Sequence, residues 1–212
     1  MEYYLTHFNA VEINATFYRK FTDQTYQKWY AHTPAEFRFV LKAPRTITHV
    51  KYLLDTDDEI REFDRSTDIL AEKRGLILLQ IAPQTPFDPI RLQRALSLFS
   101  SPPKVAVEFR HESWLTEEVY HLLQGFSAVL VNPDYPGHDL TDRLVSDVGY
   151  LRLHGRRRWY ADDYTAADLA EIAGIAERMV ERGAREVYIF FNNTVNGYAA
   201  HNAFALQAML AS

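Results

Sequence analysis

The chain has 212 residues, of which 47% are hydrophobic and 24% are charged, a length and composition typical of one globular domain. No apolar stretch approaches the roughly 20 residues of a membrane-spanning helix and the N-terminus lacks the pattern of a secretion signal, so we expect a cytoplasmic protein with no membrane partner. The formal net charge of −5 opposes wholesale electrostatic binding to nucleic acid or anionic lipid.

Short apolar and β-branched runs alternate with longer helical patterns, as is typical of repeated strand–helix units and a parallel sheet. The chain begins with aromatic residues at helical spacing, Tyr3, Tyr4 and Phe8. Seven strands are predicted, at residues 11–17, 37–43, 75–82, 104–110, 128–132, 150–154 and 187–192. Helices are predicted at residues 23–32, 57–74, 88–99, 116–124, 165–182 and 198–210, and several begin at Asp or Thr in the N-cap position. No linker divides the chain, so we expect residues 1–212 to form a single domain.

Seven strands in this order predict a TIM-type parallel α/β barrel that lacks its first strand. A complete barrel has eight strands and takes about 250 residues. Either the chain starts late, or the barrel is open beside the first visible strand and exposes an edge that must be covered.

Charged and amide side chains recur on one face of the predicted strands, because alternate residues of a strand point to opposite faces. The pairs that share a face are Glu12 with Asn14, Glu108 with Arg110, and Arg152 with His154. Lys42, Gln80 and Asn192 add polar side chains from three more strands. Both faces of a parallel barrel strand should be apolar, so this pattern favours a functional pocket at the carboxyl ends of the strands. The alternative is a buried salt-bridge network that only fills the barrel.

Three histidines follow predicted strands. His154 precedes Gly155 at a strand end, where an imidazole is placed for acid–base chemistry. His111 follows the Glu108 strand; it either faces the pocket, with Trp114 as a wall, or caps the next helix. His49 stands in a polar loop with Lys42 and Arg45, which is either an anion-binding loop or a solvated one.

No cofactor is assigned from these residues. The chain has neither a GxGxxG nor a Walker-type loop, so no nucleotide cofactor is expected. It has no cysteine, so any metal would need His, Asp or Glu ligands. Oxygen and nitrogen ligands do recur at Glu12, Glu108, His111 and His154, but their spacing is not diagnostic and the nearby cations oppose a metal site. We therefore assign no metal ligand.

Five segments in order resemble the signatures of the YecE-like family, also called domain of unknown function 72. They are VEINATFY (11–18), KAPRTITH (42–49), EFRHESW (108–114), LRLHG (151–155) and YIFFNNT (188–194). The resemblance spans nearly the whole chain and implies a TIM-type barrel with a polar pocket built from these segments, but no particular reaction. Two departures stand out: the family's glycine-rich first strand is absent, and Asn132-Pro133-Asp134 replaces an expected Ala-Asp pair, which leaves the role of Asp134 open.

The leading hypothesis is a barrel enzyme or binder for a small anionic ligand, such as a phosphorylated metabolite, with a hydrolase as the candidate class of enzyme. The catalytic candidates are Glu12, Glu108 and His154. The substrate-binding candidates are Asn14, Tyr18, Lys42, Arg45, His49, Gln80, Arg110, His111, Trp114, Arg152, Asn192 and Asn193.

Two rival hypotheses stay open. One is a nucleic-acid-binding or metal-dependent, nuclease-like barrel, in which Arg156, Arg157 and Arg158 contact the phosphate backbone. The other is a non-enzymatic regulatory or interaction module, favoured by an exposed strand edge. The oligomeric state is left open.

Overall fold

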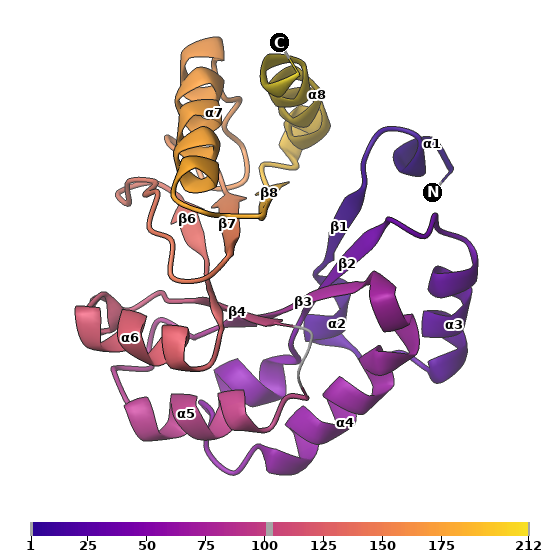
Figure 1. The fold of residues 1–212 in the computed structure, drawn as a ribbon, viewed down its shortest axis with the longest axis vertical. Coiled ribbons are helices and arrows are strands. Elements are labelled where there is room, and N and C mark those ends of the chain that lie inside the picture. Colours follow the sequence, from indigo (N-terminus) through magenta and orange to yellow (C-terminus); the bar gives the residue numbers. More distant parts are fainter. Residues whose placement is uncertain (1, 101–103, 212) are drawn as a thin grey trace. The chain divides into compact units, whose positions relative to one another are not determined.

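The computed structural model describes residues 2–100 and 104–211 (Figure 1). Two compact units follow one another along the chain, Met1–Ala128 and Val129–Ser212. Whether they belong to a single domain stays a prediction. None of the helices in the described ranges is long and apolar enough to cross a lipid bilayer.

The first unit alternates parallel strands with helices. Strands β1 to β4 are neighbours in chain order and pair in parallel, and α3 to α6 lie on one side of them (Figure 1). The strands are β1 (Ala10–Ile13), β2 (Arg38–Lys42), β3 (Arg74–Gln80) and β4 (Lys104–Glu108). The helices are α1 (Glu2–Leu5), α2 (Ala15–Tyr18), α3 (Asp23–Ala31), α4 (Asp57–Thr67), α5 (Pro89–Ser97) and α6 (Glu117–Gly125). A π-helical turn at Thr46–Val50 and short 3-10 segments at Asp68–Lys73 and Glu112–Trp114 complete the unit.

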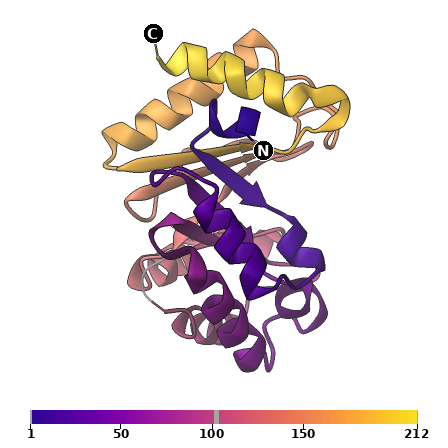
Figure 2. The same cartoon turned by 90° about the vertical axis from the view of Figure 1, so that its right-hand side faces the viewer.

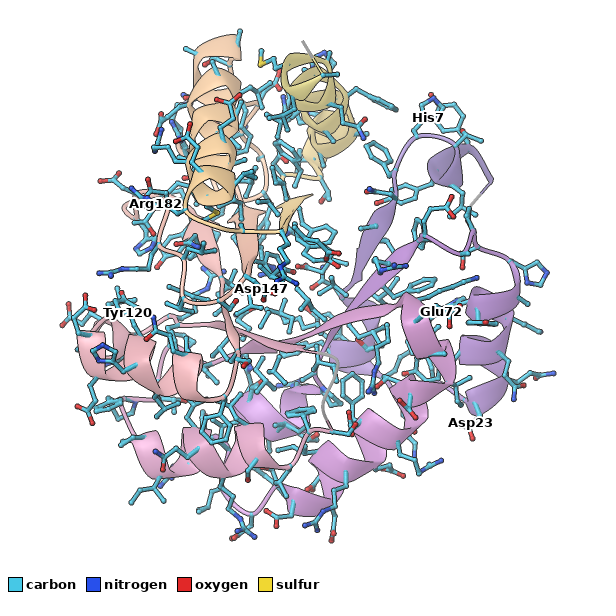
Figure 3. The ribbon with its side chains drawn as sticks, in the orientation of Figure 1. His7, Asp23, Glu72, Tyr120, Asp147 and Arg182 are labelled. Carbon is cyan, nitrogen blue, oxygen red and sulfur yellow. The ribbon has the colours of Figure 1, made fainter. Side chains whose placement is uncertain are left out.

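The core of the first unit lies between its strands and helices, where side chains fill the space (Figure 3). Leu41, Ile77 and Val105 are in register on one sheet face and buried. The Trp29 ring of α3 stacks on Phe39 of β2, with ring centroids 5.8 Å apart. Burial of such side chains is the main stabilising contribution to the unit, about 1.5–3 kcal/mol for each one.

The second unit contains a parallel sheet in the order β6-β7-β8, and α7 and α8 cover one face of it (Figures 1 and 2). Its elements are β5 (Val129–Leu130), β6 (Asn132–Asp134), β7 (Val148–Leu153), α7 (Ala166–Glu181), β8 (Glu186–Phe191), a 3-10 turn (Val195–Gly197) and α8 (Tyr198–Leu210). Its core joins Leu151 and Leu153 of β7 to Ile172 and Met179 of α7 and to Leu206 of α8.

The predicted class, an α/β fold with parallel sheets, is confirmed. The strand hydrogen bonds of the described residues show parallel sheets and do not show a closed barrel. The single strand predicted at residues 128–132 is two strands, β5 and β6, separated by Val131. Pro133 lies within β6, at the end of the three-strand order, a position that tolerates the loss of one backbone donor.

Two other predicted boundaries differ from the structure by more than two residues. The strand predicted at residues 11–17 ends at Ile13, because the Thr16 hydroxyl donates to the Ile13 and Lys42 carbonyls, at 2.9 and 2.7 Å, and holds a helical turn there. The helix predicted at residues 57–74 ends at Thr67, and a positive φ of 45° at Ala71 interrupts the 3-10 segment before β3 begins.

Candidate functional site

Four of the predicted polar side chains share one face of the first unit's sheet, at or next to the carboxyl ends of its strands. Glu12 of β1 is in register with the β2 residue that lies two positions before Lys42, and so it is on the same face as Lys42. Lys42 is in register with the β3 residue that lies two positions before Gln80, and so it is on the same face as Gln80. Gln80, the last residue of β3, is in register with Glu108, the last residue of β4. Residues in register on parallel strands point to the same side. Strand register therefore gathers two carboxylates, an ammonium and an amide at one edge.

Glu108 is fully buried, with 0% of its surface exposed. Arg110, two residues beyond the end of β4, forms an ion pair from Nη2 to Glu108 Oε1. A buried carboxylate without a partner would cost several kcal/mol, so Arg110 stabilises the charge of Glu108. Backbone hydrogen bonding between the two chain segments extends just beyond the end of β3, since the Ile81 N–H donates to the Glu108 carbonyl at 2.8 Å.

Glu12 has an amide neighbour in the turn that follows its strand. Asn14 precedes α2 and donates from Nδ2 to Glu12 Oε1 at 2.8 Å. The contact orients the Glu12 carboxylate.

Lys42 and His49 both contact the Phe17 ring. Lys42 Nζ lies 4.2 Å from the ring centroid, a cation–π contact, and the His49 ring meets Phe17 edge-on at 4.9 Å. The sequence predicted a loop at this place, but residues Thr46–Val50 form one turn of π-helix, closed by the Lys51 N–H donating to the Thr46 carbonyl at 2.9 Å. Such turns are frequent at functional sites.

The pKa of His49 is lowered to about 4, chiefly by burial and in addition by the charges of Lys42, Arg45 and Arg110, against the opposing charge of Glu108. The imidazole is therefore neutral at pH 7 and has one N–H to donate. Its Nδ1 lies 2.8 Å from the Thr48 hydroxyl. Sequence reasoning missed Phe17, because that residue was placed in a strand rather than in α2.

Two candidates in the first unit have structural roles. The Trp114 ring is 0% exposed, stacks on Phe109 at 4.9 Å, and donates from Nε1 to the Thr85 carbonyl at 2.7 Å. His111 Nδ1 accepts from the Ser113 backbone N–H at 3.2 Å, which caps the 3-10 turn. The expectation that Trp114 walls a pocket is therefore not supported, and the capping alternative describes His111. Tyr18 and Arg45 are exposed.

In the second unit, Arg152 and His154 lie together at the carboxyl end of β7. Arg152 Nη1 is 3.1 Å from His154 Nε2, and the two residues are 3% and 1% exposed. The His154 backbone holds the turn, donating to the Asp134 carbonyl at 2.8 Å and accepting from the Tyr160 N–H at 2.7 Å. The His154 ring also contacts the rings of Trp159 and Tyr160.

The two asparagines after β8 differ. Asn192 Nδ2 is buried without a hydrogen-bond partner among the described residues, so it is available to an incoming acceptor. Asn193 donates to the Asp162 carbonyl at 2.8 Å and to Asn202 Oδ1 at 2.7 Å. These contacts satisfy the Asn193 amide nitrogen, while its Oδ1 is buried without a hydrogen-bond partner among the described residues.

Asp134 is buried and pairs with Arg156. Arg156 Nε donates to Asp134 Oδ2 at 3.0 Å, and its Nη1 donates to Glu171 and Asp168 at 2.7 and 3.3 Å. Burial raises the pKa of Asp134, while Arg156 opposes that shift. Arg156 is thus already matched by three carboxylates that the sequence pattern did not connect to it.

Arg157 is paired in the same way. It donates to Asp162 Oδ1 at 3.0 Å and to Asp168 Oδ2 at 2.9 Å. Burial would raise the pKa of Asp168, but hydrogen bonds from Arg157 and Thr165 outweigh it and lower the pKa to about 2. This basic loop is therefore largely neutralised from within the protein.

Solved structures share this fold. The chain superposes on the crystal structure of a DUF72 family protein from Thermotoga maritima with a TM-score of 0.89 and 28% identity, covering 100% of this chain and 88% of that one. A DUF72 family protein from Enterococcus faecalis matches in fold with a TM-score of 0.89 at 22% identity, covering 99% and 87% of the two chains.

Two curated relatives match in sequence. UPF0759 protein YecE of Escherichia coli K12 is 34% identical over 120 residues, which are 55% of this chain and 43% of YecE, less than half the length of that relative. UPF0759 protein YunF of Bacillus subtilis is 24% identical over an alignment 243 residues long, which covers 99% of this chain and 86% of YunF. The family model described as "Protein of unknown function DUF72" matches residues 1–212, and the chain belongs to this family.

Proposed function

We propose that the protein binds a small anionic ligand, such as a phosphorylated metabolite, and acts on it at the carboxyl ends of its parallel strands, with a hydrolase as the candidate class of enzyme. The observation that carries the proposal is the strand register, which places Glu12, Lys42, Gln80 and Glu108 on one sheet face. Active sites of α/β folds form at the carboxyl ends of strands.

The chemistry of these groups suits an anion. Lys42 and Arg110 supply positive charge, and the neutral His49 supplies an N–H donor without adding charge. Glu12 and Glu108 are the candidates for moving a proton, since carboxylates beside cations can serve as general acid or base. In the second unit, Arg152 and His154 are the predicted anion-binding and acid–base residues, and Asn192 offers an unused amide donor.

We also propose the finer architecture, a TIM-type barrel. It is supported by the parallel pairing of every strand pair described and by the alternation of strands with helices.

The test is titration of the full chain with inorganic phosphate and with glycerol 3-phosphate by isothermal calorimetry. Lys42→Met removes the ammonium but keeps an unbranched side chain against Phe17. We expect it to weaken binding of the anion about tenfold or more, because a charge-assisted contact is lost. Uncharged glycerol should show no binding.

Lys28→Met is the matched control, since Lys28 is exposed on α3 away from the strand ends. It should bind the anions as the unmodified chain does, and circular dichroism should show both variants folded. If the folded Lys42→Met variant binds both anions with unchanged affinity, or if the unmodified chain binds neither, the proposal fails.

The nucleic-acid hypothesis has less support. Its expected backbone contacts were Arg156, Arg157 and Arg158, and the first two donate to carboxylates of their own unit. A guanidinium must give up such partners before it can neutralise a phosphate.

A further inference from the structure

A cavity of ≈220 Å³ lies in the first unit beside α2, the π-helical turn and α4. Aromatic rings form much of its wall, from Phe17, Phe21, Tyr26 and Phe63. An apolar cavity of roughly 150 Å³ holds one benzene ring. This cavity therefore has room for one substituted six-membered ring.

The charges around the cavity leave two arginines without a carboxylate partner among the residues that the structure describes. Glu62 forms an ion pair with Lys20, and Glu59 forms one with Lys51 at 2.5 Å. Arg19 and Arg45 both line the cavity. The Arg19 guanidinium lies over the Phe21 ring, 4.7 Å from its centroid, whereas the Arg45 side chain makes no ion pair or hydrogen bond with any residue that the structure describes. The occupant that complements this wall carries a negative charge.

Tyr26 adds a polar group to the aromatic wall. The residue is 2% exposed, yet no hydrogen bond of its hydroxyl is found within residues 2–100 and 104–211. Burial and, to a smaller extent, the charge of Asp23, labelled in Figure 3 at the start of α3, together raise the pKa of Tyr26 to about 12. The phenol thus stays protonated and can donate a hydrogen bond to a ligand in the cavity that it lines.

We propose that this cavity is a binding site for a monocyclic aromatic carboxylate. The ring packs among Phe17, Phe21 and Phe63, the carboxylate pairs with Arg45, and the Tyr26 hydroxyl donates a hydrogen bond to the same carboxylate. The cavity is distinct from the proposed anion site, because Lys42, Arg110 and Glu108 do not line it.

Benzoate is the probe, and benzamide, its neutral isostere, is the matched ligand control. Binding to the full chain is followed by ligand-observed NMR and calorimetry. We expect benzoate to bind at least tenfold more tightly than benzamide, and Arg45→Ala to remove that preference, because the charge-assisted contact is gone. Tyr26→Phe keeps the ring and should weaken benzoate binding several-fold.

Two further variants separate this site from its surroundings. Arg61→Ala removes an exposed arginine of α4 that does not line the cavity, and it should leave benzoate binding unchanged. Lys42→Met should also leave it unchanged, whether or not that variant loses phosphate binding. The proposal is overturned if benzoate does not bind, if benzamide binds equally well, if Arg45→Ala keeps the preference, or if Lys42→Met abolishes benzoate binding.

Discussion

The protonation state of His49 follows from the residues around it rather than from the histidine itself. Burial is the largest cause of its lowered pKa, and three cations, Lys42, Arg45 and Arg110, act in the same direction. A cluster that already holds this much positive charge favours a neutral imidazole and attracts an anion.

This shift predicts how stability depends on pH. The unfolded chain takes up a proton on His49 at its ordinary pKa of about 6.5, whereas the folded chain does so at about 4. The contribution of the neutral His49 to the free energy of unfolding is therefore fully present above pH 6.5 and is lost as the pH falls to about 4. Between pH 6.5 and 4 the free energy of unfolding, measured with urea, should fall by about 1 kcal/mol less in the His49→Gln variant than in the unmodified chain. This value allows for solvent screening.

His32→Gln serves as the control, because His32 is exposed at the end of α3. It should keep the full pH dependence of the unmodified chain. An identical pH dependence in His49→Gln would contradict the lowered pKa of this imidazole in the folded chain.

Some candidate residues could be predicted because side chains alternate along a strand. The sequence predicted that Lys42, Gln80 and Glu108 supply polar side chains from three different strands, and the strand register puts these three on the same sheet face. The sequence could not tell a pocket residue from a core residue. Trp114 is buried in the core and Asn193 is bonded within its own unit, because burial depends on what other elements pack against a residue.

At the scale of elements, the turn after β7 depends on Gly155. Its φ of +99° is unfavourable for any residue with a side chain, and an added Cβ would lie 2.5 Å from the Arg158 carbonyl oxygen and 2.8 Å from Asp162 Cβ. The Gly155 N–H donates to the Tyr164 hydroxyl at 2.9 Å. This turn directly follows His154.

Gly155→Ala should therefore destabilise the protein by about 3 kcal/mol or more, as measured by urea denaturation, because backbone strain and a steric clash add together. Gly137→Ala is the matched control. Gly137 also has a positive φ, of +84°, but no atom lies near its missing Cβ, so only the strain of about 1 kcal/mol applies. Equal losses in the two variants would contradict the proposed clash.

Element types were more predictable than element ends. The helix predicted at residues 165–182 is α7, and its Thr165 and Asp168 form a capping box that the sequence signals directly. The end of α4 carries no such signal. Arg74, predicted to be helical, begins β3 and is buried against Asp64 at 3.1 Å, a contact that depends on packing rather than on local preference.

At the scale of the whole molecule, net charge determines how strongly the chain binds large polyanions such as DNA and RNA. With 28 acidic and 23 basic residues, the formal charge is −5, and Arg156 and Arg157 are paired internally. We expect no electrophoretic shift of single- or double-stranded DNA or RNA at about 150 mM salt, and at most weak binding in low salt.

A binding constant that falls steeply with salt concentration would contradict this expectation, because such a slope counts phosphates neutralised by the protein. Arg158→Ala is the informative variant in that event, since Arg158 forms no ion pair with any residue that the structure describes. Loss of the slope in that variant would locate the contact in the loop after β7.

The sequence by itself determined the α/β class, the order of most strands and helices, and the family, because hydrophobic periodicity and short motifs are local properties of the chain. The tertiary structure decided which polar residues meet. It turned the chain after Ile13 so that Phe17 reaches Lys42 and His49, and it matched Arg156 to Asp134, Asp168 and Glu171. These contacts join residues far apart along the chain, and only packing brings such residues within reach of one another.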